Sequence, residues 1–239
     1  MSNNLRLDVY MQKHGIVSSR SQAENLIRLG KVELNGKVVR KAGQSVSPGS
    51  NVTIIDKQYV SRAAYKLASV AELFHLNFLT KTVLDVGSST GGFTDYALQQ
   101  GAAKVIAVDV GKEQMHPALR NNERIMLLEQ TDIRDLTALP AKPEIVVIDV
   151  SFISLQDVLP HIAKLVSKDC LIVAMLKPQF EAGAKAKHKG VIKNARVRRE
   201  IISDFENWLK DKFIIVDKAD SAVEGTKGNL ERFYALKKL

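Results

Sequence analysis

Val83-Leu84-Asp85-Val86-Gly87-Ser88-Ser89-Thr90-Gly91-Gly92-Phe93 is the stretch that decides the fold, because it joins an apolar strand, a glycine-rich turn and a helix start. In a doubly wound α/β sheet, a ligand binds beyond the carboxyl ends of the strands, at a turn of this kind. Glycines there let the backbone approach the ligand closely. The stretch therefore predicts a cofactor-binding turn, whose candidate residues are Asp85, Gly87, Ser88, Thr90, Gly91, Gly92 and Phe93.

Strands and helices alternate on both sides of this turn. The predicted strands are 82–86, 104–110, 125–130, 145–150, 171–176, 213–218 and 230–236, and the predicted helices are 61–76, 92–100, 113–119, 154–167 and 195–211. Strands such as Ile145-Val146-Val147-Ile148 are apolar at every position, which suits a parallel sheet covered on both faces. The alternation predicts an α/β fold with a Rossmann-like, seven-stranded sheet.

Acidic residues follow several of these strands. A glycine turn alone also suits NAD or FAD, but this one is not G-x-G-x-x-G, and Asp85 precedes its first glycine by two positions. A carboxylate there repels a pyrophosphate and suits an ammonium group. Asp109 can accept both ribose hydroxyls of an adenosine, and Asp132 can accept the adenine amino group. With Asp149 at the next strand end, the pattern favours S-adenosylmethionine over NAD as the cofactor.

Residues 1–56 have a different pattern and predict a small α+β domain. Helical spacing runs over Leu5–Met11, and a second helix is expected from a cap at residues 18–21 to Gly30. Asn35-Gly36 between two short strands is a strong hairpin signal, because a type I′ turn needs positive φ at both positions. We interpret residues 57–60 as a linker and residues 61–239 as a second domain.

The charge distribution favours a nucleic-acid partner. The net charge is +9, and residues 1–58 hold nine Lys and Arg against four Asp and Glu. A second run, Lys185–Arg199, has seven basic residues and no acid, and its Lys187 and Lys189 are candidate phosphate ligands. Two separate basic regions in one small chain are typical of proteins that bind nucleic acid.

Composition also excludes several classes of protein. The one cysteine, Cys170, rules out an internal disulfide and a cysteine metal cluster, and no metal is expected. No apolar stretch approaches the roughly 20 residues that span a bilayer, and the first residues lack the apolar region of a signal peptide. We therefore expect a cytoplasmic protein with no membrane partner.

Two lysines are candidates for the chemistry. Lys66 lies on the first predicted helix of the larger domain, and Lys177 follows the fifth strand at the same sheet edge as Asp149. A ribose hydroxyl is a poor nucleophile at neutral pH, so its proton must leave as the new bond forms. A desolvated lysine with a lowered pKa can accept that proton. The final predicted strand adds Glu231.

Three stretches of the small domain carry a resemblance: Ser19-Arg20-Ser21-Gln22-Ala23, Ile27-Arg28-Leu29-Gly30-Lys31-Val32 and Asn35-Gly36-Lys37. They resemble the RNA-binding module of the ribosomal protein S-four family. The resemblance implies that RNA phosphates are gripped by Arg20, Arg28, Lys31, Lys37 and Lys41. The larger domain resembles the FtsJ-like ribose 2′-O-methyltransferases, and the whole chain resembles the TlyA family. That family is often labelled haemolysin, but it is known for methylating cytidines of ribosomal RNA.

The FtsJ-like enzymes use a Lys–Asp–Lys–Glu tetrad. Matched by motif, the tetrad is Lys66, Asp149, Lys177 and Glu231. The resemblance implies that Lys177 is the base or hydroxyl-activating group, that Lys66 and Glu231 orient it and the ribose, and that Asp149 steers the ammonium. Glu224 competes for the fourth place, but the Gly-Asn-x-Glu setting favours Glu231.

Three other functions agree less well with the sequence than ribose methylation does. Amino-group methyltransferases commonly carry Pro-Pro-aromatic where this chain has Asp149-Val150-Ser151-Phe152, so base methylation of RNA is the weaker alternative. A membrane-active haemolysin conflicts with the missing membrane segment. An RNA-binding protein with an inactive catalytic domain conflicts with the presence of every candidate acid and lysine.

Overall fold

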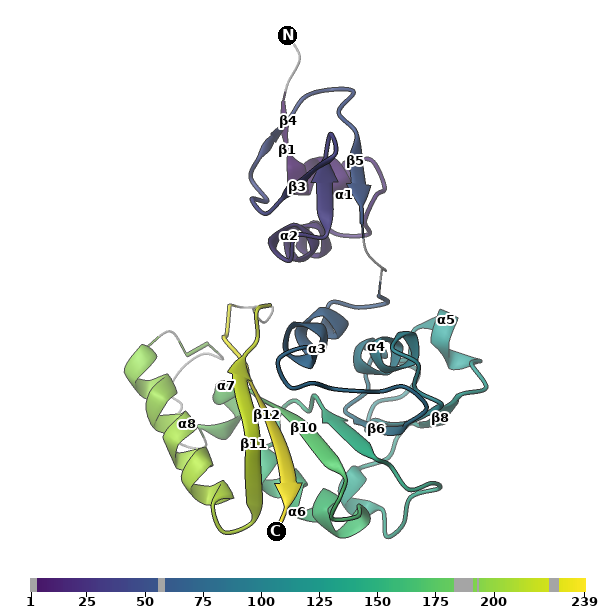
Figure 1. Cartoon of the computed structure of the whole chain (residues 1–239), viewed down its shortest axis with the longest axis vertical. Helices are drawn as coiled ribbons and strands as arrows, with labels where there is room; N and C mark the ends of the chain where they lie inside the picture. The colour runs from purple at the N-terminus through teal and green to yellow at the C-terminus, as the bar shows by residue number, and fades with distance from the viewer. Residues whose placement is uncertain (1–3, 56–58, 183–190, 193, 224–227) are drawn as a thin grey trace. The chain divides into compact units, whose positions relative to one another are not determined.

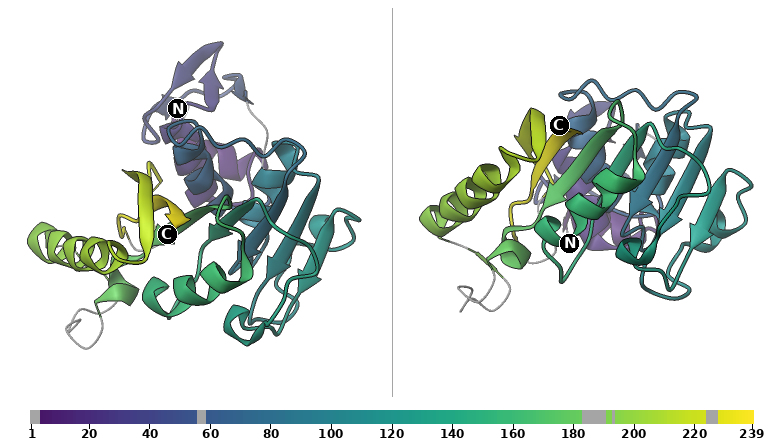
Figure 2. Two further views of the ribbon diagram at one scale, coloured as in Figure 1. Left: turned by 60° about the horizontal axis from the view of Figure 1, so that its bottom comes forward. Right: turned by 90° about the horizontal axis from the view of Figure 1, so that it is seen from below.

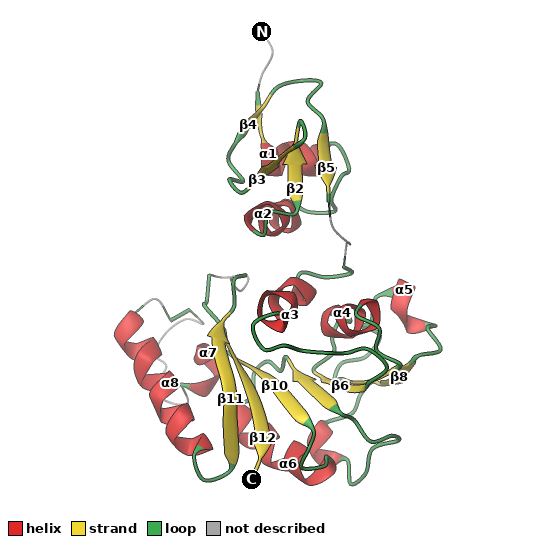
Figure 3. Cartoon of the chain, in the orientation of Figure 1, coloured by secondary structure: helices red, strands yellow, loops and turns green. Residues whose placement is uncertain are grey.

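A computed structural model describes residues 4–55, 59–182, 191–192, 194–223 and 228–239 (Figure 3). Lys187, Lys189, Glu224 and linker residues 57 and 58 therefore lie outside the described residues. The chain divides into two compact units, Met1–Arg62 and Ala63–Leu239, which are described separately.

The described residues of the first unit form two helices and five short strands (Figure 1). They are β1 (Leu5–Arg6), α1 (Leu7–Lys13), α2 (Arg20–Arg28), β2 (Val32–Leu34), β3 (Lys37–Val39), β4 (Ser45–Val46) and β5 (Val52–Ile54). Strand β2 pairs with β3 and β5, both antiparallel, and β1 pairs with β4. The apolar stripes of both helices are buried, at Leu7 and Met11 and at Ala23, Leu26 and Ile27.

The hairpin prediction is confirmed, and one helix start is wrong. Asn35 and Gly36 have φ of +51° and +77°, as a type I′ turn between β2 and β3 requires. The first helix begins at Leu7, not at Leu5, because Leu5 and Arg6 are extended and pair with Val46 and Ser45.

The second unit is built on a seven-stranded sheet with the order β11-β12-β10-β9-β6-β7-β8. The strands are β6 (Thr82–Val86), β7 (Lys104–Val108), β8 (Ile125–Leu128), β9 (Ile145–Ile148), β10 (Leu171–Leu176), β11 (Phe213–Asp220) and β12 (Arg232–Lys238). β6 to β10 run parallel, and β12 is antiparallel to both β10 and β11. The strand order reverses between β6 and β9, so a ligand site is expected there.

Helices cover both faces of this sheet (Figures 1 and 2). They are α3 (Ala63–Ala71), α4 (Gly92–Gln99), α5 (Pro117–Arg120), α6 (Leu155–Leu165), α7 (Pro178–Glu181) and α8 (Ala195–Leu209), with a 3-10 turn η1 (Ile133–Asp135). On one face, Leu84 of β6 and Val146 of β9 share a buried cluster with α6 and α8. On the other face, Phe93 of α4 packs 6.2 Å from Phe233 of β12.

Several predicted boundaries are wrong for identifiable reasons. The helix predicted over 113–119 is only Pro117–Arg120, because Glu113 has φ of +55° and proline favours the first helical position. The first helix of this unit ends at Ala71, with His75 at φ of +49° beyond it. β7 and β9 end one residue before Asp109 and Asp149, so both acids lie in the loops at the carboxyl edge of the sheet.

Candidate functional site

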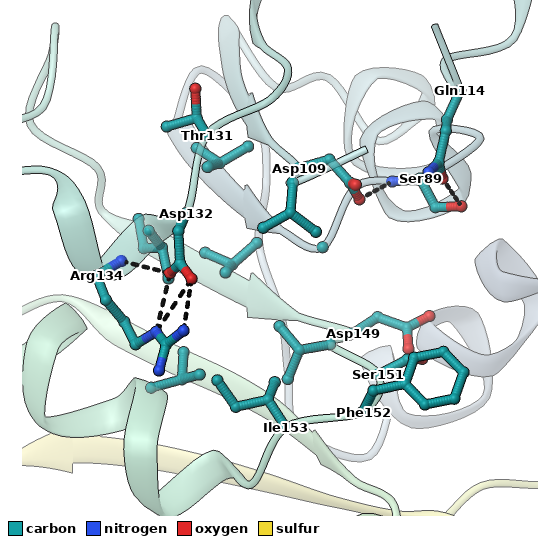
Figure 4. Close-up of a pocket in the computed structure, with 17 residues that line it drawn as sticks. Ser89, Asp109, Gln114, Thr131, Asp132, Arg134, Asp149, Ser151, Phe152 and Ile153 are labelled. Atoms are coloured by element: carbon teal, nitrogen blue, oxygen red, sulfur yellow. Dashed lines mark hydrogen bonds and ion pairs between the residues drawn. The ribbon is translucent and has the colours of Figure 1, made fainter. Parts of the chain in front are cut away.

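A pocket of about 640 Å³ opens at the carboxyl ends of β6, β7 and β9, where the strand order reverses (Figure 4). Its lining includes Gly87, Asp109, Asp132 and Asp149, which come from four successive strand ends. The structure thus brings these predicted residues together around one pocket, because the carboxyl ends of parallel strands meet at one edge of a sheet.

The glycine turn makes close backbone approach possible. Gly87 has φ of +81°, and a Cβ there would lie 2.7 Å from the backbone oxygen of Asp149. Only glycine fits this position. Gly91 also has positive φ, but a Cβ there would meet Met115 at 2.4 Å, and the residue lines neither pocket described here. We assign Gly91 a packing role at the start of α4, which differs from the cofactor contact expected of it.

Asp109 is held in one orientation by the backbone. The Ser89 amide donates to one carboxylate oxygen at 2.8 Å (Figure 4). The Gly111 amide donates to the other at 2.7 Å. Each oxygen keeps a further lone pair, so the carboxylate can still accept hydroxyl groups from a ligand.

Asp132 is not the free acceptor that the sequence suggested. The guanidinium of Arg134 donates to both carboxylate oxygens, with its terminal nitrogen 2.6 Å from one of them (Figure 4). These hydrogen bonds hold the pKa of Asp132 below its usual range. Both side chains line the larger pocket, so an incoming donor would share Asp132 with Arg134 or displace it.

A smaller pocket of about 140 Å³ adjoins the first and shares Gly87, Ser89, Asp149 and Ser151 with it. Its other lining residues include the predicted Asp85, Ser88, Thr90, Gly92, Phe93 and Lys177. The glycine turn therefore brings most of the predicted cofactor residues together with one predicted catalytic lysine.

Asp85 is the most unusual group in this pocket. Its side chain is fully buried, and Thr94 donates a hydrogen bond to one oxygen at 2.6 Å. The other oxygen has no hydrogen-bond partner among the described residues. Burial raises the pKa of Asp85 to about 7. A buried carboxylate oxygen that lacks a donor fits a ligand with an ammonium group, so the residues present are compatible with an amino-acid cofactor.

Lys177 lies at the same pocket with three contacts. Its Nζ is 2.5 Å from Oδ1 of Asp149 and donates to Oγ of Ser151 at 2.8 Å. It also lies 5.9 Å from the ring centre of Phe180. The amine therefore faces the glycine-lined pocket, and its position depends on the loop after β9.

Lys66 and Glu231 form a second, more buried ion pair. Their charged atoms are 2.5 Å apart, and their side chains are 9% and 4% exposed. Leu176 pairs with Arg232 at the last position of the β10–β12 register, so Lys177 and Glu231 are the residues that flank this pair. The four residues of the predicted tetrad thus come from α3, from the positions directly after β9 and β10, and from the position directly before β12. Lys66 and Glu231 line neither of the two pockets.

The predicted RNA-binding residues of the first unit lie at its surface. Arg28, Lys37 and Lys41 are exposed and Lys31 is partly exposed. Arg20 is half exposed, and its guanidinium donates to the buried carboxylate of Asp8 at 2.8 Å. Asp8 thus fixes the direction of one predicted phosphate ligand.

Three functional candidates were missed from the sequence. Ser151, two residues after Asp149, binds Lys177 directly, and that spacing was an available signal. Phe152 lines the larger pocket with a 91% exposed side chain and φ of +65°. Arg134 lies two residues after Asp132 and covers it, which no sequence pattern indicated.

Within the described residues, no three His, Cys, Asp or Glu side chains are grouped as metal ligands would be. No described helix combines the length and the apolar character needed to cross a membrane.

Comparison with known proteins identifies both parts of the chain. A family model of FtsJ-like methyltransferases matches residues 59–238, and a model of the S4 domain matches residues 5–52. A 16S/23S rRNA (cytidine-2'-O)-methyltransferase TlyA of Mycobacterium tuberculosis is 36% identical over 99% of this chain and 91% of its own length. A 23S rRNA (cytidine-2'-O)-methyltransferase TlyA of Campylobacter jejuni is also 36% identical, over 96% of this chain and 98% of its own length.

Solved structures agree with this relationship. A candidate hemolysin from Streptococcus thermophilus matches with a TM-score of 0.70 and 33% identity, covering 100% of this chain and 90% of its own. The fold predicted from the sequence is confirmed as a methyltransferase fold with an N-terminal S4 domain. The chain therefore belongs to the TlyA family of FtsJ-like methyltransferases.

Proposed function

We propose that this protein methylates the ribose 2′-hydroxyl of a cytidine in ribosomal RNA, with S-adenosylmethionine as the methyl donor. The relatives named as rRNA (cytidine-2'-O)-methyltransferases support the substrate. The observation that carries the reaction is the Lys177 amine, which lies in the same small pocket as Gly87 and Asp85.

The donor supplies an electrophilic methyl group on a sulfonium. Asp85 would bind its ammonium group with the carboxylate oxygen that accepts no hydrogen bond from a described residue. Gly87 would let the backbone pass close to it, and Asp109 would accept its ribose hydroxyls. Asp132 would accept the adenine amino group, in competition with Arg134. The remaining candidates, Ser88, Thr90, Gly92 and Phe93, would line the same cleft.

Lys177 would accept the proton of the ribose hydroxyl as the oxygen attacks the methyl carbon. Asp149, 2.5 Å from the amine, stabilises the ammonium that this transfer leaves. Ser151 accepts a further hydrogen bond from the same nitrogen and fixes its direction. Lys66 and Glu231, which form a buried ion pair, would orient Lys177 and the ribose. Positioning of this kind supplies much of the rate of a displacement reaction.

The N-terminal S4 domain would bind the RNA backbone with Arg20, Arg28, Lys31, Lys37 and Lys41. Lys187 and Lys189 would add phosphate contacts near the target nucleotide. Phosphate contacts set the register of a protein on its RNA without reading the sequence. A ribosomal substrate also implies action in the cytoplasm.

The direct test is to incubate the full chain with unmethylated ribosomal subunits and S-adenosylmethionine carrying a labelled methyl group. We expect label on a cytidine 2′-oxygen, located by mapping 2′-O-methyl positions and by nucleoside analysis. Label on a base would contradict the proposal and favour a base methyltransferase. Leakage of liposomes without RNA methylation would favour a haemolysin instead.

Lys177→Ala should abolish methyl transfer and leave cofactor affinity nearly unchanged. Lys81→Ala is a matched control, because Lys81 also pairs with a carboxylate, Glu144, at 2.6 Å, but at the amino end of the strands. The control should keep full activity. Loss of cofactor binding in Lys177→Ala, with activity lost only in proportion, would contradict the role of the lysine as base.

A further inference from the structure

Glu181, in the last position of α7, connects the two segments that carry the reacting groups. One of its carboxylate oxygens accepts a hydrogen bond from Oγ of Ser154 at 2.5 Å. The other accepts from the backbone amide of Leu155 at 2.8 Å. Ser154 is the last residue of the loop 149–154 and caps α6, and Leu155 is the first residue of that helix. A single side chain thus joins the segment after β10 to the far end of the loop after β9.

The near end of the same loop is held by Lys177. Its amine contacts Asp149 and Ser151 at the start of the loop, four residues before Glu181 in the chain. The ring of Phe180 lies 5.1 Å from that of Phe152 between these two attachment points. The loop 149–154 is therefore attached to the segment 177–181 at both ends and in the middle.

The loop needs such attachment because its own conformation is unfavourable. Phe152 has φ of +65°, which costs a non-glycine residue about 1–3 kcal/mol unless the surroundings enforce it. Its side chain is 91% exposed, so burial of the ring contributes little to hold the backbone there. Glu181 is a charged group that accepts hydrogen bonds from the second half of the loop and the residue after it.

We infer that Glu181 is a positioning residue of the methyl-transfer reaction, which holds the loop of Asp149 and Ser151 against the segment of Lys177. Glu181 lines neither described pocket, so it acts through the loop and not on the substrate. The inference rests on the proposed function. Displacement of reacting groups by about 1 Å can cost on the order of 100-fold in rate, so loss of this link should appear in kcat.

The test compares Glu181→Ala with Glu181→Gln in the full chain, using unmethylated ribosomal subunits as the probe. Glutamine can still accept from the Leu155 amide and can donate to Ser154, whereas alanine removes both links. We expect Glu181→Ala to lower kcat by about 10- to 100-fold, with KM and cofactor affinity within about threefold of wild type. Glu181→Gln should retain kcat within about threefold.

Glu144→Ala is the matched control for stability. Glu144 also accepts hydrogen bonds from a side chain and a backbone amide, those of Lys81 and Thr82. It differs from Glu181 because it lies directly before β9, at the amino end of the strands. Its loss should lower Tm without lowering kcat at a temperature where the variant is folded. The inference would be overturned if kcat fell in the same proportion to the drop in Tm in both alanine variants. A wild-type kcat in Glu181→Ala would also overturn it.

Exchange of the Leu155 amide hydrogen, measured by NMR, reports on its hydrogen bond to Glu181 independently of methyl transfer. Exchange should accelerate in Glu181→Ala and stay near wild type in Glu181→Gln. If wild-type protein methylates no subunit, the proposed function fails, and unchanged Leu155 exchange would separately overturn the link. Should Glu181→Ala not fold, Ser154→Ala removes one of the two contacts and must lower kcat in the same direction.

Discussion

Asp85→Asn should stabilise the protein without ligand while weakening its hold on the cofactor. Asp85 is fully buried, and one oxygen accepts from Thr94 while the other has no hydrogen-bond partner among the described residues. Asparagine preserves an acceptor for Thr94 and removes the buried charge. The substitution therefore isolates the free energy of keeping an unpaired carboxylate inside the fold.

The size of the effect follows from the pKa of Asp85. Burial raises it from 3.8 to about 7, so the folded state holds a proton that the unfolded state has released over this pH range. Wild-type stability from this group is therefore greatest below pH 4 and falls as the pH rises to about 7. At about 1.4 kcal/mol for each pH unit, the full loss is about 4 kcal/mol.

The assay is urea unfolding of both proteins between pH 5 and pH 8, because the difference between them cancels most other titrating groups. Between pH 5 and pH 8, the free energy of unfolding of the variant should rise by about 3 kcal/mol relative to that of wild type. The affinity of wild type for S-adenosylmethionine, measured by calorimetry, should rise as the pH passes 7, since the ammonium binds the ionised form. The affinity of the variant should be lower and nearly flat. If the free energies of unfolding of the two proteins change with pH in parallel, this reasoning is refuted.

Three further predictions concern other parts of the molecule. Lys66→Met should destabilise the protein by about 3–5 kcal/mol in urea unfolding, because it leaves the buried Glu231 carboxylate without its partner. Adding Glu231→Gln should recover most of that loss, and purely additive costs would contradict the pairing. Phe152→Ala should change stability by less than about 0.5 kcal/mol yet raise KM for ribosomal subunits, since the ring is exposed beside the pocket. Deleting residues 1–56 should weaken RNA binding and flatten its dependence on salt, measured by filter binding between low and moderate salt; unchanged affinity would exclude the S4 domain as an RNA grip.

The sequence predicted the sheet well because its signals are local. β7, β8, β9 and β10 each contain at least four consecutive apolar residues, and the glycine turn after Val86 needs a φ that only glycine adopts comfortably. The acids after successive strands follow from the same fact, since parallel strands end at one edge. The pairing of Lys177 with Asp149 was implied by this geometry and by the family resemblance.

The sequence did not predict the side-chain contacts that depend on how a residue orients in the folded protein. Arg134 folds back onto Asp132, and nothing in the order of residues distinguishes that from a solvent-facing arginine. The link from Glu181 to Ser154 joins residues that are far apart in the chain and belong to no motif. The helix predicted over 113–119 failed because its apolar spacing could not reveal the left-handed backbone at Glu113.

The position of β12 has a consequence for biosynthesis. It is translated after the other six strands, yet it lies between β10 and β11 and delivers Glu231 to Lys66 on the first helix of the domain. Under the proposed function, a nascent chain that ends before Glu231 would lack one residue of the catalytic tetrad. It would become able to methylate ribosomal RNA only after this segment has been translated, which would separate the synthesis of the protein from its action on ribosomes.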